Sequence, residues 1–213
     1  MSRSSLEKLE SIDQGVKRGW EMTHFEEQQE QSKWETDKPQ PALIDLEKSG
    51  AIRGEVLDIG CCSGENALYL ASQGYSVTGI DSSPTLIARA LLKASKRNLK
   101  VKFLLFDSLK IEILGMTFDT VIDCGLFHSF PRETRPQYLD SLHQVLRPGG
   151  IYHVLCSSED DLGNEGLKQT TKDELEQYFQ KGWEITNISR IMLETREQEN
   201  WDWGLLASIL RLT

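Results

Sequence analysis

VLDIGCCSGENALYLA, residues 56–71, is the stretch that decides how the rest of the chain is interpreted. The run VLDI is mostly apolar, as in a buried strand, and ENALYLA has the spacing of an amphipathic helix. Between them lies a tight turn with Gly60 and Gly64, which allow the backbone to bend sharply and to approach a ligand. The stretch therefore predicts a strand, a turn and a helix, with the turn as a candidate cofactor-binding loop.

Strand-like and helix-like segments continue to alternate on the C-terminal side of this stretch. Several of the strand-like runs are almost continuously apolar, as in parallel strands that are covered by helices on both faces. The alternation predicts a doubly wound α/β sheet. Pro136 is expected to interrupt its helix early, and RPGG at 147–150 to form a turn. The expected strands are 55–60, 75–81, 100–107, 118–125 and 151–158, and the expected helices are 65–74, 83–98 and 132–146.

The two ends of the chain differ from this middle part. At the C-terminal end, Thr171 and Glu174 give residues 170–182 the capping-box pattern of a helix. Two extended stretches, 183–196 and 200–212, then predict an antiparallel hairpin, although the second is also compatible with a short helix. Residues 1–50 are polar with a thin apolar stripe. They predict an N-terminal helical lid packed on a domain that spans residues 51–213.

Composition excludes several classes of function. The net charge of −9 and the isoelectric point near 5.0 argue against a nucleic acid as partner. No window of about 18 apolar residues and no secretory signal is present, so we expect no membrane contact and a cytoplasmic protein. The sequence is compatible with a monomer but does not fix the oligomeric state. One basic run is expected to be the solvated face of a helix and its exit. It consists of Lys93, Lys96, Arg97, Lys100 and Lys102.

The four cysteines do not have the spacing of a disulfide framework or a zinc site. No C-x-x-C pair and no H-x3-H pair occurs, so no metal is expected. All four lie in or beside apolar runs, where a reduced cysteine behaves as a small hydrophobic residue. They are Cys61, Cys62, Cys124 and Cys156.

Acidic residues follow the expected strands, where a doubly wound sheet binds its ligands. Asp81 lies 21 residues after Gly60 and has the acceptor oxygens that the two hydroxyls of a ribose require. A dinucleotide fingerprint would need glycine where Cys62 and Glu65 stand, and Glu65 at the helix start would repel a pyrophosphate. A cofactor that combines an adenosine with a positive charge fits this pattern better than a nicotinamide dinucleotide of an oxidoreductase.

Five motifs in this order carry a family resemblance: VLDIGCCSGENALYLA, VTGIDSSP, FLLFDSL, FDTVIDCGLFHSF and VLRPGG. Together they resemble the class I S-adenosylmethionine-dependent methyltransferases. WETDKPQPAL and LFHSF are similar to the small-molecule branch, which includes thiopurine, thiol, halide and heterocyclic-toxin methyltransferases. The resemblance implies a Rossmann-like, seven-stranded sheet with an antiparallel last strand. It also implies methyl transfer from S-adenosyl-L-methionine to a sulfur, nitrogen or oxygen atom of a small-molecule acceptor.

The resemblance also assigns cofactor-binding residues. It implies that the turn wraps the methionine moiety, that the strand-end carboxylates hold the amino group, ribose and adenine, and that a tryptophan closes the lid. In that order the residues are Gly60, Cys61, Cys62 and Gly64 for the turn; Asp58 for the amino group; Asp81 with Ser82 for the ribose; Asp107 with Ser108 for the adenine; Asp123 to Leu126 for the floor near the sulfonium; and Trp34 for the lid.

Cys62 departs from the family pattern, which has a second glycine at this position. Three explanations are open: a substitution tolerated because φ is negative there, weakened cofactor binding, or redox or metal chemistry. A non-catalytic binding protein with a decayed cofactor loop is the alternative function, and Cys62 is the feature that favours it.

His128 is the candidate catalytic residue, because it follows the fourth strand where the methyl group would be presented. It could act as a base towards the nucleophile, or pack and orient LFHSF without chemistry. His24 could contribute from the lid, whereas His143 and His153 are expected to be structural. Four aromatic residues indicate either an apolar acceptor or core packing, the latter favoured for the last two: Trp20, Phe25, Trp201 and Trp203.

Overall fold

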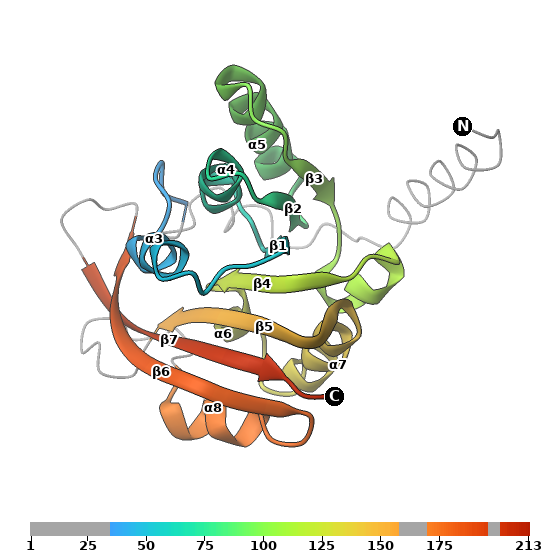
Figure 1. The fold of residues 1–213 in the computed structure, drawn as a ribbon, viewed down its shortest axis with the longest axis vertical. Helices are drawn as coiled ribbons and strands as arrows, with labels where there is room; N and C mark the ends of the chain where they lie inside the picture. The colour runs from blue at the N-terminus through green and yellow to red at the C-terminus, as the bar shows by residue number, and fades with distance from the viewer. Residues whose placement is uncertain (1–34, 158–169, 196–200) are drawn as a thin grey trace. The chain divides into compact units, whose positions relative to one another are not determined.

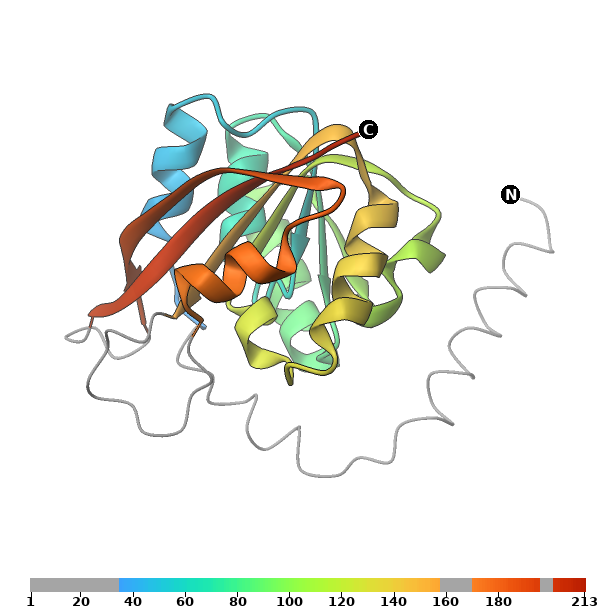
Figure 2. The same cartoon turned by 90° about the horizontal axis from the view of Figure 1, so that it is seen from below.

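The computed structural model describes residues 35–157, 170–195 and 201–213, which form one seven-stranded sheet with helices on both faces (Figures 1 and 2). The strand order is β3-β2-β1-β4-β5-β7-β6, with β7 antiparallel to both of its neighbours and the other inner pairs parallel. The doubly wound sheet and its terminal antiparallel hairpin are thereby confirmed, and the short-helix alternative is wrong. The strands are β1 (Glu55–Ile59), β2 (Ser76–Asp81), β3 (Lys102–Leu105), β4 (Phe118–Cys124), β5 (Leu146–Ser157), β6 (Trp183–Glu194) and β7 (Trp201–Arg211).

The helices divide between two buried apolar clusters, one on each face of the sheet. Leu43, Leu68 and Ala90 bring three helices into the first cluster, and Phe127 and Tyr138 belong to the second. No described helix is both long and apolar enough to cross a membrane. The first face is covered by α3 (Pro41–Lys48), α4 (Glu65–Ser72) and α5 (Pro84–Arg97), the second by the 3₁₀ helix η1 (Ser108–Leu114), α6 (Leu126–Ser129), α7 (Arg135–Val145) and α8 (Lys172–Tyr178).

The segment before β1 belongs to the core of this sheet domain. Leu43 and Leu46 of α3 are buried in the first cluster. The buried side chain of Gln40 exchanges two hydrogen bonds, of 2.8 and 3.0 Å, with the backbone of Glu194 at the end of β6. Of the predicted lid 1–50, residues 1–34 lie outside the described residues, and the part from Gln40 onward packs against the sheet, ahead of the predicted boundary at residue 51.

Three local expectations differ from the structure. Pro136 does not interrupt a helix; it occupies the first turn of α7, where its missing N–H costs nothing. RPGG is not a separate turn but part of β5, and the pairing register with β4 shifts between Phe118 and Thr120. Thr171 caps α8 as predicted, whereas the side chain of Glu174 pairs with arginines instead of completing the capping box.

The two histidines expected to be structural both pack against neighbouring side chains of the domain. The buried ring of His153 lies 2.9 Å from Ser208 Oγ through Nδ1, and burial lowers the pKa of His153 to about 4. His143 packs edge-on against Trp183 in the second cluster. Neither lies at the carboxyl end of β4.

Candidate functional site

The loop between β1 and α4 winds through three left-handed residues. Gly60, Cys62 and Gly64 have φ values of 70°, 49° and 85°. A Cβ atom on Gly64 would lie 2.7 Å from the ring of Phe103, so this position needs glycine for space as well as for its conformation. The loop is tied to β2, because the N–H groups of Gly60 and Cys61 both donate to the carbonyl oxygen of Ile80 at 2.9 Å.

The negative φ expected for a tolerated Cys62 is wrong. Its φ is positive, not negative, which is a strained conformation for a residue with a side chain. The Cys62 N–H donates to Asp81 Oδ2 at 2.9 Å, and this bond holds the strained loop in place. Burial raises the pKa of the Cys62 thiol, so the thiol is protonated at neutral pH. No group of metal-ligating side chains forms among the described residues.

Replacing Cys62 with glycine should therefore stabilise the protein. Glycine removes a left-handed penalty of roughly 1–2 kcal/mol and adds an entropic cost of roughly 0.5–1 kcal/mol. We expect Cys62→Gly to raise the free energy of unfolding by up to about 1 kcal/mol, and Cys62→Val to lower it by about 2 kcal/mol. Chemical denaturation measures both. If the glycine variant lost as much stability as the valine variant, contacts of the thiol, not its φ, would control this position.

Asp58 is a buried carboxyl group with one oxygen that accepts no hydrogen bond. Its Oδ2 accepts the N–H of Ala67 at 3.1 Å, whereas its Oδ1 is buried without a hydrogen-bond partner. Burial raises the pKa of Asp58 to about 7; the Ala67 N–H opposes the rise, and the charges of Asp81 and Asp123 add to it. A buried acceptor of this kind needs a donor, and a cationic donor would restore its normal ionisation.

Asp81 lies at the end of β2 and joins the loop to the next helix. Its two oxygens accept the N–H groups of Cys62 and Ser83, each at 2.9 Å. Burial raises its pKa, and these two bonds oppose the rise. Each carboxylate oxygen has a second lone pair, so Asp81 can still accept two further hydrogen bonds. Asp107 caps η1 by accepting the Leu109 N–H at 2.9 Å through Oδ1, and its side chain is 36% exposed, so it too can accept further hydrogen bonds.

The carboxylate of Asp123 is committed to the core instead of the loop. It is fully buried and accepts hydroxyl groups from Tyr138 and Tyr152, both at 2.7 Å, together with the first N–H groups of α6. Two other members of the predicted floor lie near the loop: Cys124 lines a pocket with it, and Leu126 packs against Gly60. A Cβ on Gly60 would lie 3.2 Å from the Cβ of Leu126.

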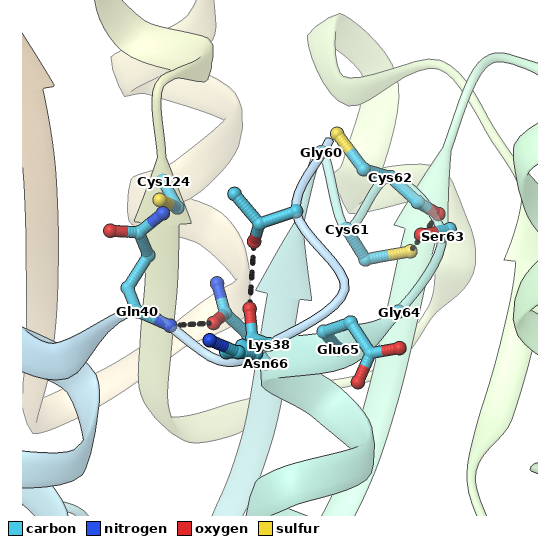
Figure 3. A pocket seen from close by; sticks show the side chains of 11 residues that line it. Lys38, Gln40, Gly60, Cys61, Cys62, Ser63, Gly64, Glu65, Asn66 and Cys124 are labelled. Carbon is cyan, nitrogen blue, oxygen red and sulfur yellow. Dashed lines mark hydrogen bonds between the residues drawn. The ribbon is translucent and has the colours of Figure 1, made fainter. Parts of the chain in front are cut away.

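A pocket lies between the loop and the segment that precedes α3 (Figure 3). Five of the predicted residues line it, namely four from the loop and Cys124 from the predicted floor. Thr36, Lys38 and Gln40 carried no signal in the sequence, because the segment before α3 meets the loop only in the folded chain. The Gln40 N–H donates to Asn66 Oδ1 at 3.0 Å across this meeting point. The lining residues are Thr36, Lys38, Gln40, Gly60, Cys61, Cys62, Ser63, Gly64, Glu65, Asn66 and Cys124.

Two residues of the basic run also form ion pairs, although Arg97 is exposed as expected and Lys93 is half-buried. Lys93 Nζ lies 2.8 Å from Glu65 Oε1 and 2.8 Å from Ser63 Oγ, and Arg97 binds both oxygens of Glu65 at 2.7 and 2.8 Å. Glu65 is nearly buried at the start of α4, so its charge requires these partners. Lys96, Lys100 and Lys102 are exposed, as expected.

His128 lies in α6 directly after β4, as expected, but its side chain is only 2% exposed.

Trp203 is 42% exposed, and the Arg190 guanidinium lies 4.6 Å from the centre of its ring, so the preference for core packing is wrong for this residue. The remaining candidates lie outside the described residues or side chains. They are Trp20, His24, Phe25, Trp34 and Trp201.

Comparison with known proteins identifies relatives of this chain. A family model described as a methyltransferase domain matches residues 56–150. The 2-heptyl-1-hydroxyquinolin-4(1H)-one methyltransferase of Mycobacteroides abscessus is 35% identical over 159 residues, which are 73% of this chain and 70% of that protein. The probable S-adenosyl-L-methionine-dependent methyltransferase TehB of Haemophilus influenzae is 28% identical over 148 residues, 68% of this chain and 51% of that protein. A solved structure described as "Conversion of a Disulfide Bond into a Thioacetal Group during Echinomycin Biosynthesis" aligns with a TM-score of 0.77 and 34% identity over 84% of each chain.

Proposed function

The chain belongs to the class I S-adenosylmethionine-dependent methyltransferases, and from this premise we propose that its acceptor atom is a sulfur or an acidic oxygen that is reactive at neutral pH without a protein base. Methyl transfer from S-adenosylmethionine to a small molecule is the reaction that this membership establishes. The acceptor atom and the roles of the site residues are the subject of the proposal.

The described residues fit the cofactor. Asp58 Oδ1 is a buried acceptor without a partner, which suits the ammonium group, and the spare lone pairs of Asp81 suit the ribose hydroxyls. The left-handed turn at Gly60 exposes backbone to the methionine moiety, and Leu126 lies against it. When bound, S-adenosylmethionine supplies a methyl group on a positively charged sulfur that is ready to leave as a neutral thioether. The remaining predicted contacts, from Ser82, Asp107, Ser108 and Trp34, are part of the proposal.

The state of the ionisable groups at the carboxyl end of β4 supports the proposed acceptor class. The oxygens of Asp123 are occupied by hydroxyl and N–H donors, and burial raises the pKa of Cys124 far above neutral. The side chain of His128 is 2% exposed. None of these three offers an exposed base, which favours an acceptor that has already lost its proton when it reacts. The protein then contributes alignment and the exclusion of water.

Exposed apolar side chains near the same end of the sheet favour a flat, partly apolar acceptor. Met192 and Trp203 face each other across β6 and β7, and each is 42% exposed. Gly204, the next residue, pairs with Ser157 at the carboxyl end of β5. The relatives are consistent with this chemistry, because one is named for a hydroxyl-bearing quinolone and another for a disulfide.

The proposal is tested with acceptors of graded pKa: an aromatic thiol, an N-hydroxy heteroarene, a simple phenol and an aliphatic amine. We expect His128→Ala to change kcat with the thiol and the N-hydroxy compound by less than about threefold, because a protein base contributes about 10²-fold or more only where a proton must be removed. S-adenosylhomocysteine formation from pH 6 to 9 is the measurement, and kcat/KM should follow the pKa of each acceptor. A loss of about 10²-fold with the thiol would contradict the proposal.

A further inference from the structure

Helix α6 directly follows the carboxyl end of β4 and contacts the cofactor loop, but it is too short to be stable on its own. Leu126–Ser129 is a single turn, and isolated turns are unstable because the nucleation of a helix is costly. Leu126, at its first position, packs against Gly60 of the loop. The position of α6 therefore depends on the groups that hold its two ends.

The N-terminal end of α6 is held by the buried carboxylate of Asp123. This carboxylate accepts the N–H of Leu126 at 2.8 Å and that of Phe127 at 3.1 Å. It is fixed in turn by the hydroxyls of Tyr138 and Tyr152, each at 2.7 Å. A negative charge at this end also matches the direction of the peptide dipoles.

The C-terminal end of α6 is held by Arg135, whose side chain is fully buried. Its Nε donates to the carbonyl oxygen of Phe130 at 3.3 Å, and its Nη2 to that of His128 at 3.5 Å. The guanidinium carbon lies 4.7 Å from the centre of the Phe127 ring. Arg135 thus satisfies terminal carbonyls of α6 and supplies the positive charge that this end favours.

A buried guanidinium needs a compensating charge, which comes from α8. Arg135 Nη1 donates to Glu174 Oε1 at 2.8 Å. Arg132 binds the same oxygen at 3.0 Å, but its side chain is 71% exposed. Among the described residues, Arg135 is the one of these two arginines that donates to the carbonyl groups of His128 and Phe130.

We propose that the Arg135–Glu174 pair is a positioning device for methyl transfer. It fixes α6, and through α6 it fixes Leu126 against the cofactor loop. Neither member touches the reacting atoms, so each acts through the helix. The inference rests on the proposed function in one respect, namely that the acceptor reacts beside α6.

Arg135→Lys is the test variant, and Arg132→Lys is the matched control on the same carboxylate. Lysine keeps the charge but cannot bind Glu174 and two carbonyl groups in a fixed fork. We expect Arg135→Lys to speed hydrogen exchange of peptide 126–130 about tenfold and to lower kcat about 10²-fold, with the KM for acceptor changed far less. Arg132→Lys should match the wild type in both. Glu174→Gln, which retains the fork, should show smaller changes in the same direction.

The outcomes separate the two proposals. Equal exchange of peptide 126–130 in the Arg135 and Arg132 variants would overturn the positioning role, whatever the acceptor. If Arg135→Lys does not fold, unchanged exchange and unchanged kcat in Glu174→Gln would overturn it as well. If the wild type methylates none of the acceptors, the proposed acceptor class fails, and exchange measured without acceptor still decides the role of Arg135.

Discussion

Affinity for S-adenosylmethionine should fall about tenfold for each pH unit below 7, and so about 10²-fold between pH 7 and pH 5. The cause is Asp58, whose pKa burial raises to about 7 in the free protein. On the proposed assignment the cofactor's ammonium group pairs with the ionised carboxylate, so below pH 7 binding must displace a proton from Asp58. Between pH 7 and the pKa of the ammonium group itself, the affinity should be level.

Asp58 also determines how the free energy of unfolding of the cofactor-free protein changes with pH. Between the ordinary pKa of 3.8 and about 7, the folded state holds a proton that the unfolded state has lost. The contribution of Asp58 to the free energy of unfolding therefore decreases as the pH rises through this range, and is level above it.

Titration calorimetry in buffers of different ionisation enthalpy measures the proton release on cofactor binding.

Asp58→Asn is the control for this pH dependence, because asparagine can still accept the Ala67 N–H but cannot ionise. Its affinity should be low and nearly independent of pH from 5 to 7. An unchanged slope in this variant would assign the pH dependence to another group and remove Asp58 from the ammonium site.

Asp81→Ala should raise the Kd for S-adenosylmethionine by about 10²-fold or more. If Asp81 holds the ribose as proposed, two hydrogen bonds from ribose hydroxyls to a carboxylate are lost, and bonds to a charged acceptor contribute about 1.5–3 kcal/mol each. The N–H of Cys62 also loses its acceptor at 2.9 Å, which loosens the loop. Calorimetric titration of wild type and variant at one pH measures the difference.

A second carboxylate provides the matched control for this variant. Asp119 accepts the Glu55 N–H at 2.8 Å and pairs with Arg147, so it supports the sheet in a comparable way at the amino end of β4. Asp119→Ala should lower the stability and leave the Kd for the cofactor unchanged. If Asp81→Ala left the Kd unchanged as well, the assignment of Asp81 to the ribose would be wrong.

Features of the fold and of the candidate site that depend on residues close together in the sequence were predictable. Apolar runs and their spacing defined the strands, and the terminal hairpin followed from two extended stretches without a helix between them. Asp58 and Asp81 were recognisable because carboxylates at the ends of neighbouring parallel strands meet at one edge of the sheet. The Thr171 cap was recognisable because it depends on residues only three positions apart.

The parts that depend on tertiary contacts were not predictable. The conformation of Cys62 is set by its bond to Asp81, and a negative φ was the simpler assumption for a residue with a side chain. The function of Asp123 as an anchor depends on Tyr138 and Tyr152, which are remote in sequence. Lys93 and its neighbours had the pattern of a solvated face, and only the fold brings Glu65 within their reach.

Calorimetric titration of the purified protein with S-adenosylmethionine, and separately with NAD, tests the central claim most directly. The claim is that the loop from Gly60 to Gly64 is a working site for this cofactor although Cys62 stands where the family has glycine. The account predicts micromolar binding of S-adenosylmethionine and none of NAD. Absence of S-adenosylmethionine binding at pH 7.5, with the protein folded, would contradict it.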